Sequence, residues 1–386
     1  MFWNRLSLRH GLIAAGTVVA LLAGCTHPSV KPVSPSTTTT TDTPVTWNTL
    51  PPTSDTEVVA GFKAWRAGCV KLQNDAVWAK PCQAAAKLPL SPAAVRDFMQ
   101  SQLDIYALGT DEGREGLITG YYEPVYVGSL TRTAKATVPV YAVPDDLIVV
   151  ALDEVYPELK GKRLRGRLKG RTLVPYDAAS TIASNGSKAP VIAWLTNPMD
   201  LQFLQIQGSG RVQLPGGRQL RLAYADQNGR PYRAIGKWLV EQGELKSADV
   251  SMQSIRAWAT AHPARIADML ASNPSYVFFE RKPDSNDGPS GSLNVPLTAG
   301  YSVAVDRRAI PLGSLVWMST TTPDGLNLSR PVAAQDTGGA IAGTVRADLF
   351  LGTGDSAGEL AGRMKQAGRL WLLWPRGVAL PSASAK

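Results

Sequence analysis

Between residues 116 and 375, apolar residues come in short runs that Gly and Pro repeatedly interrupt. Segments such as "GLITGYYEPVYVG" and "TVPVYAVPDDLIVV" alternate or cluster their apolar residues over a few positions and then turn. Short strands tolerate such punctuation, whereas long helices do not. We therefore expect a protein that is mainly β with peripheral helices, in which about six strands with Gly-rich links form a closed or nearly closed barrel.

Helical spacing is confined to a few stretches. Apolar residues recur every three or four positions in 56–103, where Ser91 and Pro92 predict a helix start. Further helices are predicted within 247–272 and near 356–368. We expect strands at 189–196, 201–225 and 231–240, with "LPGGRQ" as a hairpin turn.

The N-terminus predicts the compartment. Arg5 and Arg9 precede an apolar run that ends at Cys25 in "LLAGC". This is the pattern of a secretory signal, and the run is shorter than the roughly 20 residues of a spanning helix. "LLAGC" resembles the bacterial lipobox, which predicts a signal peptide at 1–24 and lipidation of Cys25. The alternative is an ordinary signal peptide that happens to contain a Cys.

The segment after Cys25 predicts a tether. Residues 25–46 are rich in Pro, Ser and Thr, so they cannot offset their ordering entropy by burial, and we expect disorder. The formal charge of +9 falls by two, to +7, once Arg5 and Arg9 leave. A basic exported protein suits an anionic partner such as cell-wall polymer or lipid headgroups, and not nucleic acid. Because Thr26 is not Asp, the lipoprotein is expected at the outer membrane, facing the periplasm.

Cysteine and histidine are too scarce for a zinc site. Only His262 falls within the predicted fold, and the two remaining cysteines, Cys69 and Cys82, are too few for a Cys cluster. Whether these two cysteines form a disulfide stays open, because sequence does not give their separation. We expect no metal and no cofactor.

The stretch 335–358, "QDTGGAIAGTVRADLFLGTGDSAG", places Asp336, Asp348 and Asp355 among glycines. Neither phosphate-binding Gly pattern occurs there, and the acids are more widely spaced than in a calcium loop, which leaves a loop-type cation site as a weak alternative. A serine nucleophile is also disfavoured, because "QGSGR" at Ser209 lacks the first Gly of the usual elbow.

The remaining interpretation is a carboxylic acid at a barrel rim. Asp348 is flanked by apolar residues, and partial burial would raise its pKa toward that of a general acid. Asp336 and Asp306 each end a predicted strand, so the three acids could gather at one end of the barrel. The alternative is that such residues only accept backbone hydrogen bonds in turns.

Long motifs in the chain resemble the membrane-bound lytic murein transglycosylase A family, whose C-terminal segment is called the 3D domain. The resemblance covers about 56–375 and keeps the family's order. The motifs are "TGYYEPVYVGSLTRTAKATVPVY", "FLQIQGSGRVQLPGG", "YADQNGRPYRAIGKWLVEQGEL", "SMQSIRAW", "NPSYVFFE", "VAVDRRAIPLGS", "QDTGGAIAG" and "RADLFLGTG".

The resemblance implies a fold and a reaction. It implies a double-psi β-barrel at 45–123 plus 286–380, an inserted β-rich substrate-binding domain at 124–285, and a substrate groove between them. It also implies cleavage of the β-1,4 bond between N-acetylmuramic acid and N-acetylglucosamine in peptidoglycan, which leaves 1,6-anhydromuramoyl ends. Asp348 matches the catalytic acid, and Asp336 and Asp306 match the two supporting aspartates.

Two motifs fit the holding of glycan strands. "TGYYEP" offers Gly120, Tyr121, Tyr122 and Glu123, and "IQGSG" offers Gln207, Gly208, Ser209 and Gly210. The alternatives are structural roles: the tyrosines pack in the core or between domains, and "QGSG" is only a hairpin bulge. Wall-synthesis proteins are expected as partners. At the level of function, the rivals are a wall-binding module and a hydrolytic glycosidase.

Overall fold

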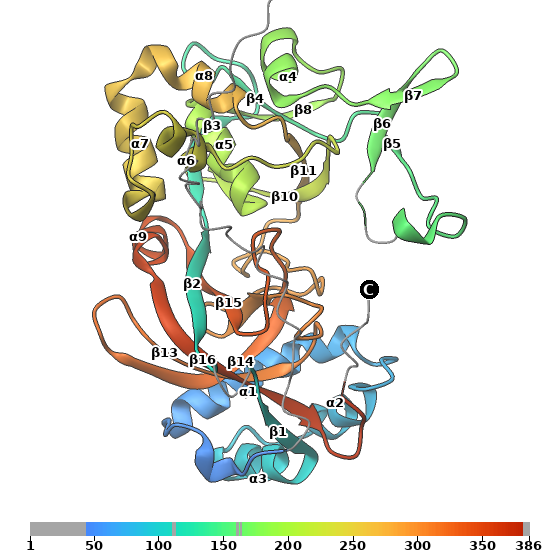
Figure 1. Ribbon diagram of the computed structural model, residues 1–386, viewed down its shortest axis with the longest axis vertical. Helices are drawn as coiled ribbons and strands as arrows, with labels where there is room; N and C mark the ends of the chain where they lie inside the picture. Colours follow the sequence, from blue (N-terminus) through green and yellow to red (C-terminus); the bar gives the residue numbers. More distant parts are fainter. Residues whose placement is uncertain (1–43, 110–112, 160–161, 163, 381–386) are drawn as a thin grey trace, which may run out of the picture. The chain divides into compact units, whose positions relative to one another are not determined.

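The structure is a computed structural model that describes residues 44–109, 113–159, 162 and 164–380. The predicted signal peptide, Cys25 and the tether up to residue 43 lie outside these residues. The described part is mainly β with some helices, as predicted (Figure 1). At the end of the predicted tether, Val45 already forms a bridge with Ile105. Within the described residues, no helix is long and apolar enough to cross a membrane.

Three helices precede the first strand, as the spacing in 56–103 predicted. They are α1 (Asp55–Gly68), α2 (Ala79–Ala86) and α3 (Pro92–Gln102). The side chains of Ser54 and Ser91 cap α1 and α3, and α1 buries Phe62 and Trp65 in the large hydrophobic core. A disulfide between Cys69 and Cys82 answers the question that the sequence left open.

The largest sheet closes on itself. Its strands are β1 (Leu103–Ala107), β2 (Gly116–Glu123), β12 (Ser302–Val305), β13 (Leu315–Thr321), β14 (Asn327–Asp336), β15 (Arg346–Thr353) and β16 (Lys365–Pro375). Their order is β1-β16-β13-β14-β12-β15-β2, and β2 pairs with β16 as well. Every strand except β1 therefore belongs to a closed ring of pairings, while the double-psi crossover stays a prediction.

The segment between β2 and β12 builds two further sheets. The larger has the order β11-β10-β9-β3-β8-β4. Its strands are β3 (Val125–Ser129), β4 (Val138–Tyr141), β8 (Val191–Leu195), β9 (Ser209–Gln213), β10 (Gln219–Gln227) and β11 (Val277–Lys282). The smaller, with the order β5-β6-β7, contains β5 (Ile148–Val149), β6 (Arg165–Lys169) and β7 (Thr172–Pro175). The domain boundaries predicted from the sequence stay a prediction.

The first part of the segment predicted as strands at 201–225, and most of the one at 231–240, are helices instead. Residues 198–207 form α5 (Pro198–Gln207), because Asn197 caps it, Pro198 occupies its first turn and Gly208 ends it with a φ of +74°. Residues 235–241 form α6 (Ile235–Glu241), which buries Ile235 and Leu239. Short apolar runs fit either period, so these two were not separable by pattern alone.

The remaining helices agree with the sequence more closely. The predicted helical region 247–272 contains α7 (Met252–Ala261) and α8 (Ile266–Ala271), while α4 (Ala179–Asn185) was not predicted. The predicted short helix near 356–368 is α9 (Asp355–Arg363), and β16 begins two residues after it. The turn in "LPGGRQ" does join β9 to β10 as a hairpin.

Candidate active site

Asp348 is the third residue of β15 and is half-buried. Its register partner on β2 is Thr119, whose hydroxyl donates to Asp348 Oδ1 at 2.5 Å. Burial raises the pKa of Asp348, and the nearby Asp336 carboxylate raises it further. The Thr119 hydrogen bond and the Arg346 charge act in the opposite direction, but burial dominates. The result is a carboxyl group that keeps its proton to a higher pH than an exposed Asp.

Asp336 is the last residue of β14, and both of its carboxylate oxygens accept hydrogen bonds. Tyr121 on β2 donates its hydroxyl to Oδ2 at 2.8 Å. Oδ1 accepts from the backbone N–H and the hydroxyl of Ser292, and from the backbone N–H of Thr337, each at 2.9 Å. Burial, followed by the Asp336 charge, raises the pKa of Tyr121, so the phenol stays a donor. Asp336 is thus fixed in place by strands and loops that are far apart in sequence.

Asp306 directly follows β12 and is buried. Arg308 donates from Nε and Nη2 to its two carboxylate oxygens at 2.8 and 2.6 Å, and the Gly343 N–H donates to Oδ2 at 2.9 Å. The bonds from Arg308 are the main cause that lowers the pKa of Asp306 to about 2. Asp306 therefore stays ionised and ties the end of β12 to the loop that leads into β15.

Asp336 and Asp348 lie on two strands that flank β12, and Asp306 directly follows β12. Ala304 on β12 pairs with Asp348 on one side and with Asp336 on the other. With strands about 4.8 Å apart, the backbones of the two acids are roughly 10 Å from each other. Asp306 lies two residues after Ala304, directly past the end of β12. The structure therefore brings together the acids that the sequence predicted, whereas Asp355 begins α9 and is exposed.

A groove with a volume of about 920 Å³ runs beside these acids. Tyr121, Asp306 and Asp336 line it from the large sheet, and Gln207, Gly208 and Ser209 line it from the second sheet and α5. Asp348 is not one of its lining residues, but its partner on β2, Thr119, lies two residues before the lining residue Tyr121, and its charge acts on the Tyr121 hydroxyl. The groove also contains residues not predicted from the sequence: Tyr232, Lys282, Ser292 and Arg307.

The other predicted substrate-binding residues lie away from the groove. A Cβ on Gly120 would come within 2.5 Å of Leu351 and 3.2 Å of Ala361, so this glycine allows close packing of α9. Tyr122 is buried against α9, and its hydroxyl contacts Met252 Sδ at 3.3 Å. A Cβ on Gly210 would lie 2.6 Å from the Leu204 side chain. These three residues pack beneath the residues that line the groove and do not line it themselves.

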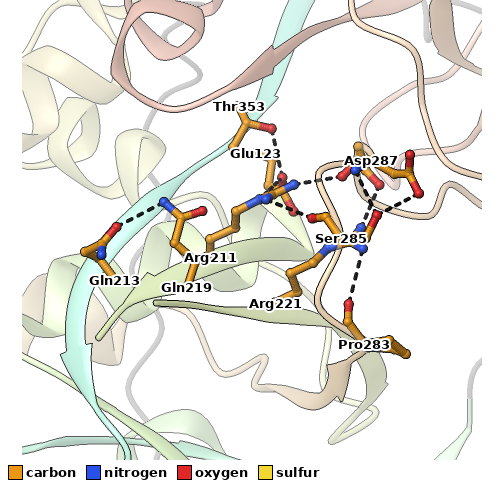
Figure 2. A network of polar contacts seen from close by, with 10 residues as sticks. Glu123, Arg211, Gln213, Gln219, Arg221, Pro283, Ser285, Asp287 and Thr353 are labelled. Carbon is orange, nitrogen blue, oxygen red and sulfur yellow. Dashed lines mark hydrogen bonds and ion pairs between the residues drawn. The ribbon is translucent and has the colours of Figure 1, made fainter. Parts of the chain in front are cut away.

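Glu123 is part of a buried polar network that Figure 2 shows. Its Oε2 accepts from Arg211 Nε and from Thr353 Oγ1, both at 2.8 Å. The side chains of Arg211 and Glu123 are only 8% and 1% exposed. Arg211 also donates to the carbonyls of Ser285 and Asp287 at 3.2 and 2.7 Å. One guanidinium therefore joins the strand that leaves the large sheet to the segment that returns to it.

Thr119 is a site residue that the sequence interpretation missed. It opens the "TGYYEP" motif, in which the tyrosines and Glu123 drew attention as sugar-binding types. Its hydrogen bond to Asp348 depends on the parallel pairing of β2 with β15, across 229 residues of sequence. The position of Thr119 inside a matched motif was the only signal available.

Comparisons with known proteins identify the family to which the chain is similar. The model of the MltA specific insert domain matches residues 117–280, and that of the 3D domain matches 301–374. Membrane-bound lytic murein transglycosylase A of Escherichia coli strain K12 is 34% identical over 287 residues, which cover 72% of this chain and 71% of that protein.

Solved structures are similar over most of the chain. A crystal structure of MltA from Neisseria gonorrhoeae is 36% identical with a TM-score of 0.75, and the match covers 85% of this chain and 91% of that one. A structure of E. coli MltA with bound chitohexaose is 26% identical with a TM-score of 0.66, covering 87% of this chain and 96% of that one.

Proposed function

Because the chain belongs to the membrane-bound lytic murein transglycosylase A family, we propose that it cleaves the β-1,4 bond between N-acetylmuramic acid and N-acetylglucosamine without using water. It is a peptidoglycan lytic transglycosylase, as its curated relatives are. The observation that carries the finer proposal is the half-buried Asp348, whose raised pKa suits a general acid.

One carboxyl group serves both steps of the proposed reaction. Protonated Asp348 donates its proton to the bridging oxygen as the bond from C1 to that oxygen breaks. The resulting oxocarbenium-like centre is attacked by the sugar's own C6 hydroxyl. The Asp348 carboxylate takes the hydroxyl proton as the new C1–O6 bond forms, so the acid is regenerated and a 1,6-anhydro end is left. A hydrolase would need a second carboxyl group near the bond to activate water or form a covalent intermediate.

The neighbouring residues have supporting roles in this proposal. The Asp336 carboxylate raises the pKa of Asp348 and holds the Tyr121 hydroxyl at the groove. Asp306 holds the loop that leads into β15, the strand of Asp348, through its hydrogen bond with the backbone of Gly343. Holding the C6 hydroxyl over C1 makes the attack intramolecular, which favours it strongly over attack by dilute water. No metal and no cofactor enters the proposed scheme.

The groove is the proposed site for the glycan strand. Gln207, Gly208 and Ser209 offer an amide, open backbone and a hydroxyl, while Tyr121 offers a ring and a polar tip. A relative has been solved with bound chitohexaose, which supports a sugar oligomer as the occupant. Gly120, Tyr122, Glu123 and Gly210 are proposed to support the groove rather than to touch the sugar.

Attachment to the membrane is proposed to depend on Cys25. Relatives carry the description "membrane-bound", and "LLAGC" supplies a lipidation site. We place the lipid anchor at Cys25, the protein at the outer membrane and its fold in the periplasm. Wall-synthesis proteins remain the proposed protein partners.

Mass spectrometry of the products from purified sacculi tests the reaction. We expect anhydromuropeptides from the parental protein and a rate lower by about 10²- to 10⁴-fold with Asp348→Asn. Reducing ends from the parental protein would identify a hydrolase, and intact sacculi with retained binding would identify a wall-binding module. Release of anhydro products at the parental rate by Asp348→Asn would show that another group is the acid.

A further inference from the structure

The hairpin of β6 and β7 belongs to the smallest sheet, and in Figure 1 it extends away from the sheet of β10 and β11. Lys169 pairs with Thr172 across a two-residue turn, in which Gly170 has a φ of +61°. Glycine at the first position of such a turn is a standard solution for a tight hairpin. The hairpin is therefore well formed at its tip although few other elements support it.

One face of this small sheet is apolar and open to solvent. Leu168 pairs with Leu173, and Gly166 pairs with Ile148 on one side and Pro175 on the other, so all five lie on the same face. Leu168 is 61% exposed and Leu173 is 44% exposed. Paired leucines on a strand normally face a core, and exposed apolar groups of this kind mark contact surfaces.

The opposite face carries the polar contacts to the rest of the protein. Arg165 forms an ion pair with Asp226 at 2.9 Å. Arg167 donates from two nitrogens to Asp177 and lies over the ring of Tyr176. The usual arrangement of an antiparallel sheet, apolar inside and polar outside, is thus inverted here. The inversion leaves the leucine face without a partner in the described part of the chain.

Two cations lie at the tip of the hairpin: Lys169, whose pairing with Thr172 puts it on the face opposite the leucines, and Arg171 in the turn. Lys169 and Arg171 are exposed, and neither forms an ion pair with any residue that the structure describes. The acidic residues of the sheet's other loop, Asp153, Glu154 and Glu158, lie before β6, at its opposite end. Five strand residues span roughly 16 Å, which exceeds a Debye length of about 8 Å, so these acids are largely screened from the tip.

We propose that the β6–β7 tip docks on an anionic lipid surface. The side chains of Leu168 and Leu173 would enter the headgroup region, and Lys169 and Arg171 would bind lipid phosphates. Apolar side chains beside unpaired cations are the combination that such an interface binds. This contact would hold the second sheet at the membrane independently of any lipid on Cys25. The proposal does not depend on the reaction that the groove catalyses.

Flotation with vesicles tests this proposal on residues 26–386, which lack Cys25 and contain every residue that the structure describes. The probes are vesicles of phosphatidylglycerol with phosphatidylethanolamine and vesicles of phosphatidylcholine alone. We expect binding to the anionic vesicles and much weaker binding to the neutral ones. Leu168→Asp/Leu173→Asp should reduce binding at least tenfold, by the apolar area removed. Lys169→Gln/Arg171→Gln should reduce it about 30-fold.

The matched control is Leu326→Asp, since Leu326 is 68% exposed in a different hairpin, and it should leave binding unchanged. Thermal unfolding and cleavage of sacculi should match the parental protein in every variant, because none touches the groove. Equal binding to both vesicle types, an equal loss with Leu326→Asp, or no parental binding would overturn the proposal. So would a concentration-dependent dimer that Leu168→Asp/Leu173→Asp abolishes, because the face would then bind a second copy.

Discussion

Asp348 and Asp336 lie opposite the same residue, Ala304, on the two strands that flank β12. The charge of Asp336 therefore acts on Asp348 across one strand and helps to raise its pKa. The arrangement separates the two carboxyl groups too far for a shared proton, yet near enough for each to sense the other's charge. The proposed general acid is consequently adjustable by residues that never touch the substrate.

Asp336→Asn should shift the pH profile of glycan cleavage to lower pH. The substitution removes a negative charge that favours protonated Asp348, so the pKa of Asp348 falls and the active acid is lost earlier as pH rises. The alkaline limb of kcat/KM against pH reports this directly. Asp355→Asn, which alters an exposed acid at the start of α9, should leave the limb in place. A limb that stays fixed with Asp336→Asn would contradict the coupling.

Thr119→Val should have the opposite effect. The Thr119 hydroxyl stabilises the Asp348 carboxylate, so its removal raises the pKa of Asp348 and moves the alkaline limb to higher pH. Thr353→Val is the matched control on the neighbouring strand, because its hydroxyl donates to Glu123 instead. If both valine variants moved the limb alike, a general packing effect would explain the shift better than the hydrogen bond.

Glu123→Gln should destabilise the fold by about 3–5 kcal/mol, because it leaves the Arg211 charge buried without its partner. The double variant Glu123→Gln/Arg211→Met should lose less than the sum of the two single variants. Urea unfolding monitored by circular dichroism measures each free energy. Asp324→Asn breaks the exposed pair with Arg363 and should cost less than about 1 kcal/mol. If Glu123→Gln lowered the free energy of unfolding by an equally small amount, the buried pair of Glu123 and Arg211 would contribute little to stability.

Asp306 should make the fold sensitive to strong acid. Its pKa is about 2 in the folded protein and about 3.9 in an unfolded chain, so its contribution is complete above pH 4 and is lost as pH falls toward 2. The shift corresponds to about 2.6 kcal/mol at most, and the contribution is smaller than this because Arg308 is exposed and its charge is screened. Stability measured between pH 5 and about 2.5 should fall less steeply in Asp306→Asn than in the parental protein. If the stability of the two proteins fell in parallel with pH, the ionisation of Asp306 would not contribute to stability.

Much of the fold was predictable because its signals are local. The cap at Ser91 and the short runs that form β12 and β14 could be predicted from adjacent residues. The region of α5 was misassigned because a short apolar run fits two periods. The strand predicted at the α6 segment was wrong for the same reason.

The acids of the candidate site could be predicted from the sequence, but the residues that hydrogen-bond to its carboxyl groups could not. Asp336, Asp348 and Asp306 stood out as acids at or within predicted strands, and the motifs gave them roles that stay predictions. The Thr119 contact and the Arg211 network depend on pairings between distant strands, which no local pattern contains. Glu123 was expected at the sugar because its motif is rich in stacking and hydrogen-bonding groups, yet burial places it with Arg211.

The pairing of β2 with β15 has a consequence for timing. The hydroxyl that contacts the proposed acid precedes it by 229 residues, and the whole second sheet is synthesised between them. Such a non-local contact forms late, after shorter loops have closed. A growing chain that has completed the second sheet therefore still lacks the proposed acid. The contact between Thr119 and Asp348 can form only when almost all of the chain has been made.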